Sequence, residues 1–168
     1  TVVIKVSDGM ATSSGANVTV NVTAVNDAPV ITATGTVTTP EDTPVTLTLS
    51  DVTVTDTDGD LSFTLIAESG TNYTVSNNTI TPSANFNGML QVPVKVSDGT
   101  AYSVSVNLTV NVTPVNDAPV ITSTPSVTAT QSQLYTYTVI ASDVDNSTLT
   151  YSLSGQPTGM TIADNVIS

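Results

Sequence analysis

The sequence predicts an all-β fold, in which sandwich domains of about seven strands follow one another along the chain. Two observations support this prediction. Valine, isoleucine and leucine alternate with threonine, serine and asparagine in many short stretches, and two blocks of sequence return after 90 residues. Alternation with a period of two is typical of strands that bury one face. A repeat of this length fits one small sandwich domain and is too long for a solenoid turn.

The repeated blocks divide the chain. IKVSDG at residues 4–9 returns as VKVSDG at 94–99, and VNDAPVIT at 25–32 returns unchanged at 115–122. We therefore expect one complete repeat between two partial ones. The expected divisions are 1–24 (the last two strands of a first repeat), 25–117 (a complete repeat) and 118–168 (the first part of a third).

The complete repeat contains about seven predicted strands, which suits a Greek-key sandwich of the immunoglobulin or cadherin type. No stretch has a helical period. The predicted strands are 31–37, 45–49, 61–65, 73–75, 79–81, 90–96 and 102–112. Apolar residues take odd positions up to Leu49 but even positions from Val52, so we expect a β-bulge near Ser50 and Asp51.

The composition excludes several classes of function. Asp and Glu number 14 against 2 Lys and Arg, which gives a net charge of −12. Such a field repels nucleic acid and attracts cations. The chain has no Cys and no His, so it offers neither disulfides nor the usual catalytic bases and thiol nucleophiles. We expect no enzyme activity. Because no apolar run approaches about 18 residues, we also expect no direct membrane insertion.

Acidic residues gather where the predicted domains meet. An up-and-down path of strands brings the loop containing Asp56, Asp58 and Asp60 to the same end as Asp98 and the entering linker. Crowded carboxylates repel one another unless a cation neutralises them. Calcium accepts six to eight oxygen ligands, and without His or Cys no ligand favours zinc or copper. The sequence therefore predicts Ca²⁺ at the junctions.

The motifs resemble a known family. VKVSDG at 94–99 followed by VNVTPVNDAP at 110–119 resembles the end of a cadherin repeat, as found in cadherin-like tandem repeats of bacterial surface proteins and adhesins. The resemblance implies calcium ligands at both junctions. They are Asn26, Asp27, Asp56, Asp58 and Asp98 at the upper one, and Glu41, Asn116, Asp117, Asp143 and Asp145 at the lower one.

The sequence also departs from that family. The stretch SANFNG at 83–88 lacks the acidic cluster that cadherins have there, so we expect one or two ions per junction. Residues 135–139 and 159–162 are more similar to a bacterial immunoglobulin-like repeat, which makes the third repeat a divergent member.

Other interpretations of these residues stay open. The acidic loops could be ordinary solvated turns. Asp56 could begin an EF-hand, although Leu61 stands where that loop needs glycine. Tyr73 and Tyr102 could form a small sugar-binding platform, whereas Phe63 and Phe86 are better explained as core residues.

The resulting prediction is a calcium-binding spacer in the stalk of a large secreted or cell-surface adhesin-type protein of bacterial kind. Its partners would be neighbouring repeats of the same polypeptide. One alternative is a module that binds surface glycans or proteins. Another is a filament subunit, in which the head of one copy completes the tail of the next. A simple excerpt from a longer polypeptide explains the same two partial repeats.

Overall fold

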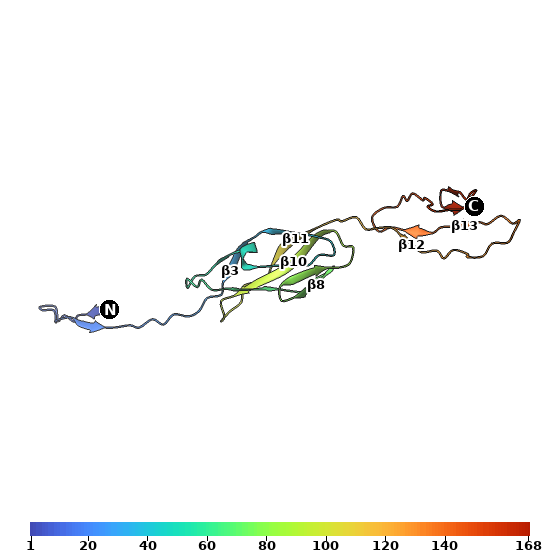
Figure 1. Ribbon diagram of the computed structural model, residues 1–168. Helices are drawn as coiled ribbons and strands as arrows, with labels where there is room; N and C mark the ends of the chain where they lie inside the picture. The colour runs from blue at the N-terminus through green and yellow to red at the C-terminus, as the bar shows by residue number, and fades with distance from the viewer.

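Three groups of strands follow one another along the chain in the computed structural model, which describes residues 1–168 (Figure 1). The first group is a hairpin, here called the N-terminal hairpin, made of β1 (Val2–Ile4) and β2 (Ala16–Val18). The second is the middle domain, which contains β3 to β11. The third is the C-terminal segment, residues 120–168, which contains β12 to β16.

The middle domain has two layers of strands. Its strands are β3 (Val30–Thr34), β4 (Thr36–Pro40), β5 (Val45–Thr46), β6 (Val52–Thr55), β7 (Thr64–Ala67), β8 (Tyr73–Ser76), β9 (Thr79–Pro82), β10 (Gly88–Ser97) and β11 (Val106–Thr113). One layer is the four-stranded sheet β4-β11-β10-β7. The other consists of the pair β3-β6 and the sheet β5-β9-β8. This all-β sandwich is the fold that the sequence predicted.

The first predicted strand, 31–37, is in fact two strands. β3 pairs with β6 in one layer, whereas β4 runs parallel to β11 in the other. The chain changes layer at Gly35, whose N–H donates a hydrogen bond of 2.8 Å to the Asp51 carbonyl.

Two other predictions in this domain need correction. The irregularity near Ser50 is a turn of 3-10 helix, η1 (Leu49–Asp51), and the register shift lies in β3 between Ile31 and Ala33. The Asp51 carboxylate accepts the Thr48 N–H at 2.7 Å and so stabilises the turn. The predicted strand 61–65 corresponds to β7, which begins only at Thr64, where its ladder with β10 starts opposite Ser97.

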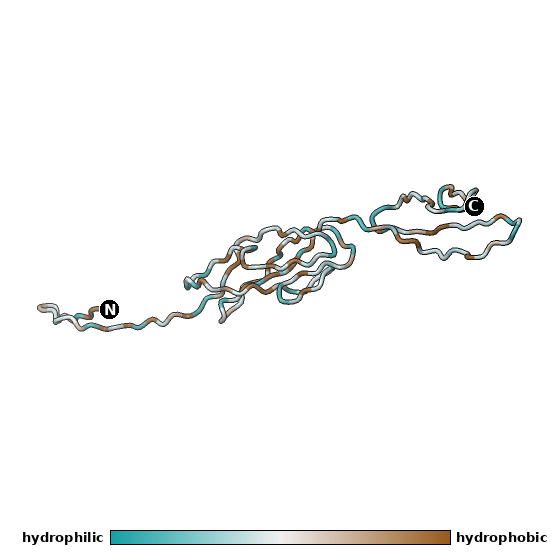
Figure 2. Tube along the Cα trace, in the orientation of Figure 1, coloured by the Kyte–Doolittle hydropathy of each residue, from teal (hydrophilic) through white to brown (hydrophobic).

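The core of the molecule lies between the two layers. Eleven buried side chains form it, and the valines and leucines of β10 and β11 make up most of them: Leu47, Leu65, Tyr73, Ile80, Leu90, Val92, Val94, Val96, Leu108, Val110 and Val112. Phe63 and Phe86 pack against this core, as their apolar character predicted. Figure 2 shows the same alternation of apolar and polar residues along the strands.

The N-terminal hairpin and the C-terminal segment bury fewer hydrophobic side chains than the middle domain does. The C-terminal segment contains β12 (Val120–Ile121), β13 (Tyr137–Thr138), β14 (Ala141–Ser142), β15 (Ile162–Ala163) and β16 (Val166–Ile167). They form the pair β12-β14 and the sheet β13-β16-β15. Val139 is the one buried hydrophobic side chain outside the middle domain apart from Pro29. The chain contains no helix long and apolar enough to cross a membrane.

Candidate metal centre

Acidic side chains meet at the entrance to the middle domain, here called the upstream junction and defined by Asn26, Asp27, Asp56, Asp58, Asp60 and Asp98. The loop between β6 and β7 supplies Asp56, Asp58 and Asp60, and the turn between β10 and β11 supplies Asp98. Carboxylate oxygens of Asp56, Asp60 and Asp98 lie within 4.8 Å of one another. The fold therefore brings the two loops together at the end where the linker enters.

The β10–β11 turn fixes the position of Asp98. Its Oδ1 accepts the N–H groups of Thr100 at 2.6 Å and Ala101 at 2.7 Å. Its Oδ2 accepts the Asn26 side-chain amide at 3.0 Å. The hydrogen bond from the Ala101 N–H, followed by those from Asn26 and Thr100, lowers the pKa of the Asp98 carboxyl below its ordinary value. Asp98 is therefore a carboxylate under ordinary conditions.

A second cluster lies between the middle domain and the C-terminal segment, here called the downstream junction. It is defined by Glu41, Asp42, Asn116, Asp117, Asp143, Asp145 and Asn146. Glu41 follows β4 and is only 4% exposed. Its Oε1 accepts the Val115 N–H at 2.6 Å, and its own N–H bonds the Thr113 carbonyl at 2.9 Å. These two bonds fasten the glutamate to the start of the linker.

The linker meets the acidic loop in the same way at both junctions. The Asp27 N–H donates to Asp58 Oδ2 at 2.6 Å, and the Asp117 N–H donates to Asp145 Oδ2 at 2.6 Å. The side-chain amide of the preceding asparagine bonds the aspartate carbonyl in each linker, at 2.8 Å for Asn26 and 2.6 Å for Asn116. The two junctions therefore repeat one arrangement.

Three carboxylate oxygens at the junctions are buried and have no hydrogen-bond partner: Glu41 Oε2, Asp56 Oδ2 and Asp117 Oδ2. Nor does any basic side chain neutralise them. The chain has two lysines, and its one ion pair joins Lys95 to Glu68 at 2.8 Å, away from both junctions. A buried carboxylate oxygen without a partner is costly, so a cation from solution would stabilise both clusters.

The Asp117 carboxyl is the clearest sign of this crowding. Burial raises its pKa above the ordinary value, and the negative charges of Asp145, Asp42, Glu41 and Asp143 raise the pKa further. Both causes disfavour the charged form. A bound cation would lower the pKa of Asp117 again, because it favours the charged carboxylate.

The donor set fits a hard cation. The side chains that define the two junctions offer carboxylate and amide oxygens, and neither thiol nor imidazole exists in the chain. This chemistry suits calcium, which accepts many oxygens in an irregular shell, better than magnesium with its strict octahedron. In the upstream cluster the candidate ligands are carboxylates of Asp56, Asp60 and Asp98. In the downstream cluster they are those of Glu41 and Asp117.

All ten residues predicted as ligands lie at the junctions, but three neighbours were not among them. Asp60 shares the upstream cluster. Asp42 raises the pKa of Asp117 and accepts the Asn85 N–H at 3.0 Å. Asn146 donates to Asn116 Oδ1 at 3.1 Å. The sequence did contain a sign that these residues belong to the junctions, because each stands close to a predicted ligand. Asp60 extends the Asp-x-Asp spacing, and Asn146 follows Asp145.

A comparison with known families identifies the middle domain. The bacterial Ig domain family matches residues 26–111, which is half of the chain. The chain belongs to this family. Bacterial Ig domains are typically non-enzymatic structural modules, often of surface proteins, and this agrees with the predicted class of function. No curated protein sequence matches the chain.

The family match also changes which part of the chain is assigned to a bacterial Ig-like repeat. The sequence motifs indicated a bacterial Ig-like repeat for the C-terminal segment, whereas the bacterial Ig domain found by comparison is the middle one. The likeness to cadherin-like repeats remains a resemblance of the linker and loop motifs.

The idea of a tyrosine platform is wrong, because Tyr73 is a core residue with 6% exposure while Tyr102 is exposed.

Proposed function

We propose that this bacterial Ig domain chain is a calcium-dependent spacer, in which Ca²⁺ at the junctions fixes the angle between successive domains. The division of the chain into repeats 1–24, 25–117 and 118–168 is part of the proposal. In a secreted or cell-surface adhesin-type protein, such a string would hold a binding domain away from the cell.

The observation that carries the proposal is the Glu41–Asp117 contact region. Glu41 belongs to the domain before the linker, Asp117 to the linker itself, and each has a buried carboxylate oxygen without a partner. Asp145, from the segment after the linker, bonds the Asp117 backbone. A cation held by these groups would connect two folded units and the chain between them. Without the cation, repulsion among the carboxylates favours opening of the hinge.

The direct test measures stiffness. Small-angle scattering of the whole chain should give a longer and narrower distribution of maximum dimensions with calcium than with chelator. Calorimetry should detect sites with dissociation constants of about 10⁻⁴ to 10⁻³ M, as in other extracellular calcium modules. Identical scattering in both conditions, despite measured binding, would refute the stiffening mechanism. No heat at all would refute the metal site and leave the loops as solvated turns.

A further inference from the structure

Glycine follows an aspartate or an asparagine at four points of the chain. These steps are Asp8–Gly9, Asp58–Gly59, Asn87–Gly88 and Asp98–Gly99. At such a step the glycine nitrogen can approach the side-chain carbonyl carbon of the preceding residue, because glycine has no Cβ that obstructs it. Ring closure between these two atoms is the first stage of isoaspartate formation. The hydrogen bonds of the fold decide which of the four steps is free to react.

The β10–β11 turn holds both reacting groups of its step. Ser97 Oγ accepts the Gly99 N–H at 3.1 Å, and Asp98 Oδ1 accepts the N–H groups of Thr100 at 2.6 Å and Ala101 at 2.7 Å. The turn of the N-terminal hairpin repeats these bonds 90 positions earlier. A hydrogen-bonded N–H loses its proton only when the bond opens. Two of the four steps are therefore held in an unreactive arrangement.

The step at Asn87 lies at the start of a strand. Gly88 is the first residue of β10 and pairs with Val112 of β11. Attack by the Gly88 nitrogen on the Asn87 side chain therefore requires the end of the ladder to open. The sheet holds this third step as the serine hydroxyls hold the first two.

Nothing holds the glycine of the remaining step. Asp58 and Gly59 lie in the loop between β6 and β7, and both are exposed. The Gly59 N–H makes no hydrogen bond. The Asp58 carboxylate accepts one bond from outside the loop, from the Asp27 N–H to Oδ2 at 2.6 Å. Thr57 precedes Asp58 as Ser97 precedes Asp98, but its hydroxyl does not bond the glycine. Both reacting groups are thus accessible at this step.

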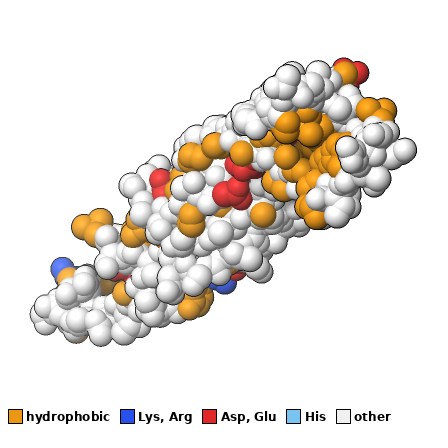
Figure 3. All heavy atoms as spheres, turned by 45° about the vertical axis from the view of Figure 1, so that its right-hand side comes forward, with side chains coloured by type: hydrophobic (Ala, Val, Ile, Leu, Met, Phe, Trp, Pro, Cys, Tyr) orange, Lys and Arg blue, Asp and Glu red, His pale blue; other side chains and the backbone are white.

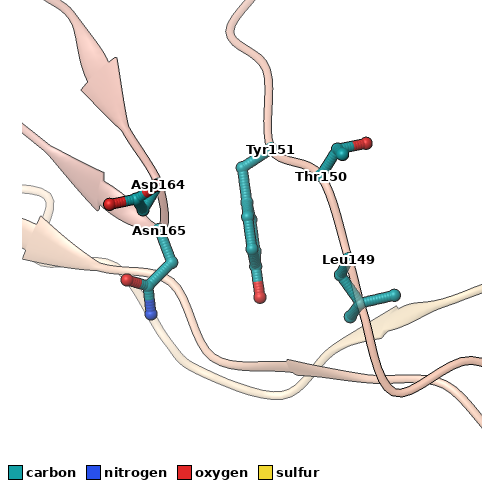
Figure 4. Close-up of a pocket in the computed structure, with 5 residues that line it drawn as sticks. All are labelled: Leu149, Thr150, Tyr151, Asp164 and Asn165. Carbon is teal, nitrogen blue, oxygen red and sulfur yellow. The ribbon is translucent and has the colours of Figure 1, made fainter.

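Exposure alone does not distinguish Asp58 from other acidic residues. Figure 3 shows acidic side chains at the surface in several separate groups. Asp164 is also exposed, on the β15–β16 turn (Figure 4), but Asn165 follows it and donates its side-chain amide to the Val139 carbonyl at 3.0 Å. In the downstream loop Asn146 follows Asp145. A side chain on the following residue hinders the approach to its nitrogen, so these positions lack the feature that Asp58 has.

We propose that Asp58 is a site of isoaspartate formation, with water as the only co-reactant. The Gly59 nitrogen attacks Cγ of Asp58 and forms a C–N bond. The amide proton and the carboxyl OH leave together as one water molecule, which gives a succinimide ring. Water then opens the ring at either carbonyl. Opening at the former backbone carbonyl joins the chain through the Asp58 side chain, with no net gain or loss of atoms and no oxidation.

The change affects one junction and spares the other. Isoaspartate adds one methylene to the backbone and carries its carboxylate on a shorter arm, so it displaces the oxygen that accepts the Asp27 N–H. Asp145 keeps its bond from the Asp117 N–H, because no glycine follows it. The linker therefore loosens at the upstream junction as the protein ages. This inference rests on hydrogen bonds of the chain itself and is independent of the proposed function.

The test ages the whole chain at neutral pH in chelator and maps isoaspartate by mass spectrometry with electron-transfer fragmentation. Isoaspartate should form at Asp58 at least about fivefold faster than at Asp98, which is the change in an equilibrium that one ordinary hydrogen bond makes. Amide exchange at Asp27 should become faster in the isomerised fraction, while exchange at Asp117 stays the same. Equal rates at Asp58 and Asp98 would overturn the proposal. Unchanged exchange at Asp27 would overturn the link to the upstream junction.

Two variants test the physical reason. Ser97→Ala removes the acceptor of the Gly99 N–H, so isoaspartate formation at Asp98 should rise towards the rate at Asp58. Asp58→Glu keeps a carboxylate but requires a larger ring, so the loop should stay unmodified and exchange at Asp27 should not change with age. Ser105→Ala is the matched control, because its hydroxyl bonds Glu68 and no glycine.

The parent protein provides the same comparison without substitution. Native-state hydrogen exchange should be faster at the Gly59 amide than at the Gly99 amide, because both exchange and ring closure need the free N–H. This measurement decides the question if Ser97→Ala disturbs the β10–β11 turn. Slower exchange at Gly59 than at Gly99 would contradict the assignment of the open step.

Discussion

The upstream and downstream junctions contain the same linker sequence but different neighbours. At the upstream junction the linker meets the loop and turn of the domain that follows, through Asp58 and Asp98. At the downstream junction it also meets the domain that precedes it, through Glu41. Asp27 is exposed in the first case, whereas Asp117 is half-buried in the second. The half-buried Asp117 therefore lies close to Glu41, a carboxylate of the domain that precedes the linker.

Each junction therefore combines the shared linker with a different further group. The β10–β11 turn contributes Asp98 to the upstream junction, and the end of β4 places Glu41 at the downstream one. Calcium bound at the downstream junction, as proposed, would connect the middle domain, the linker and the C-terminal segment.

The largest expected effect comes from Glu41→Gln. The amide keeps an oxygen for the Val115 N–H but loses the charge beside Asp117. We expect the downstream site to bind calcium at least about tenfold more weakly, since even supporting residues of a metal site typically contribute that much. The upstream site should be unchanged. Residue-resolved NMR titration of the Asp27 and Asp117 amides reports the two sites separately.

Glu68→Gln is the matched control, because Glu68 pairs with Lys95 away from both junctions. It should leave both titration curves in place. Equal weakening of both sites by Glu41→Gln would mean that the junctions do not act separately, and the comparison between them would fail.

The second expected effect is on the melting temperature measured in chelator, which Asp98→Asn and Asp117→Asn should change in opposite directions. Hydrogen bonds lower the pKa of Asp98, so its carboxylate contributes stability that is present above the ordinary carboxyl pKa and lost as pH falls through the lowered value. Burial and neighbouring charges raise the pKa of Asp117, so its contribution is present below the ordinary pKa and lost as pH rises through the raised value.

At neutral pH without calcium, Asp98→Asn should therefore lower the melting temperature, and Asp117→Asn should leave it equal or raise it. With calcium the second variant should lose part of the stabilisation that the parent gains. Thermal melts at acidic and neutral pH check both statements. Melting temperatures that fall equally in chelator would contradict the assignment of Asp117 to a repulsive cluster.

The sequence predicted which loops and linkers meet at the two junctions, but it predicted the ends of the strands less accurately. The repeated linker and the Asp-x-Asp spacing were enough to expect both junctions, because an up-and-down path of strands dictates which loops meet. It did not reveal that the chain changes layer at Gly35, since alternation of apolar residues continues through the crossing. Nor did it reveal the role of Glu41 in bonding Val115, which depends on a backbone contact between residues 74 positions apart.

The smallest expected effect is on calcium affinity, when one loop residue of each junction is replaced by its counterpart in the other. Asp56, Asp58 and Asp60 alternate in the upstream loop, whereas Asp143, Asp145 and Ser147 alternate in the downstream one. Because the affinity of a calcium site rises with its number of charged ligands, Ser147→Asp should strengthen downstream binding several-fold, and Asp60→Ser should weaken upstream binding similarly. The same NMR titration measures both. If Ser147→Asp bound no better, the carboxylate of Asp60 would act by closing the upstream loop on Asp98 and not as a ligand, and the two junctions would differ in loop shape as well as in charge.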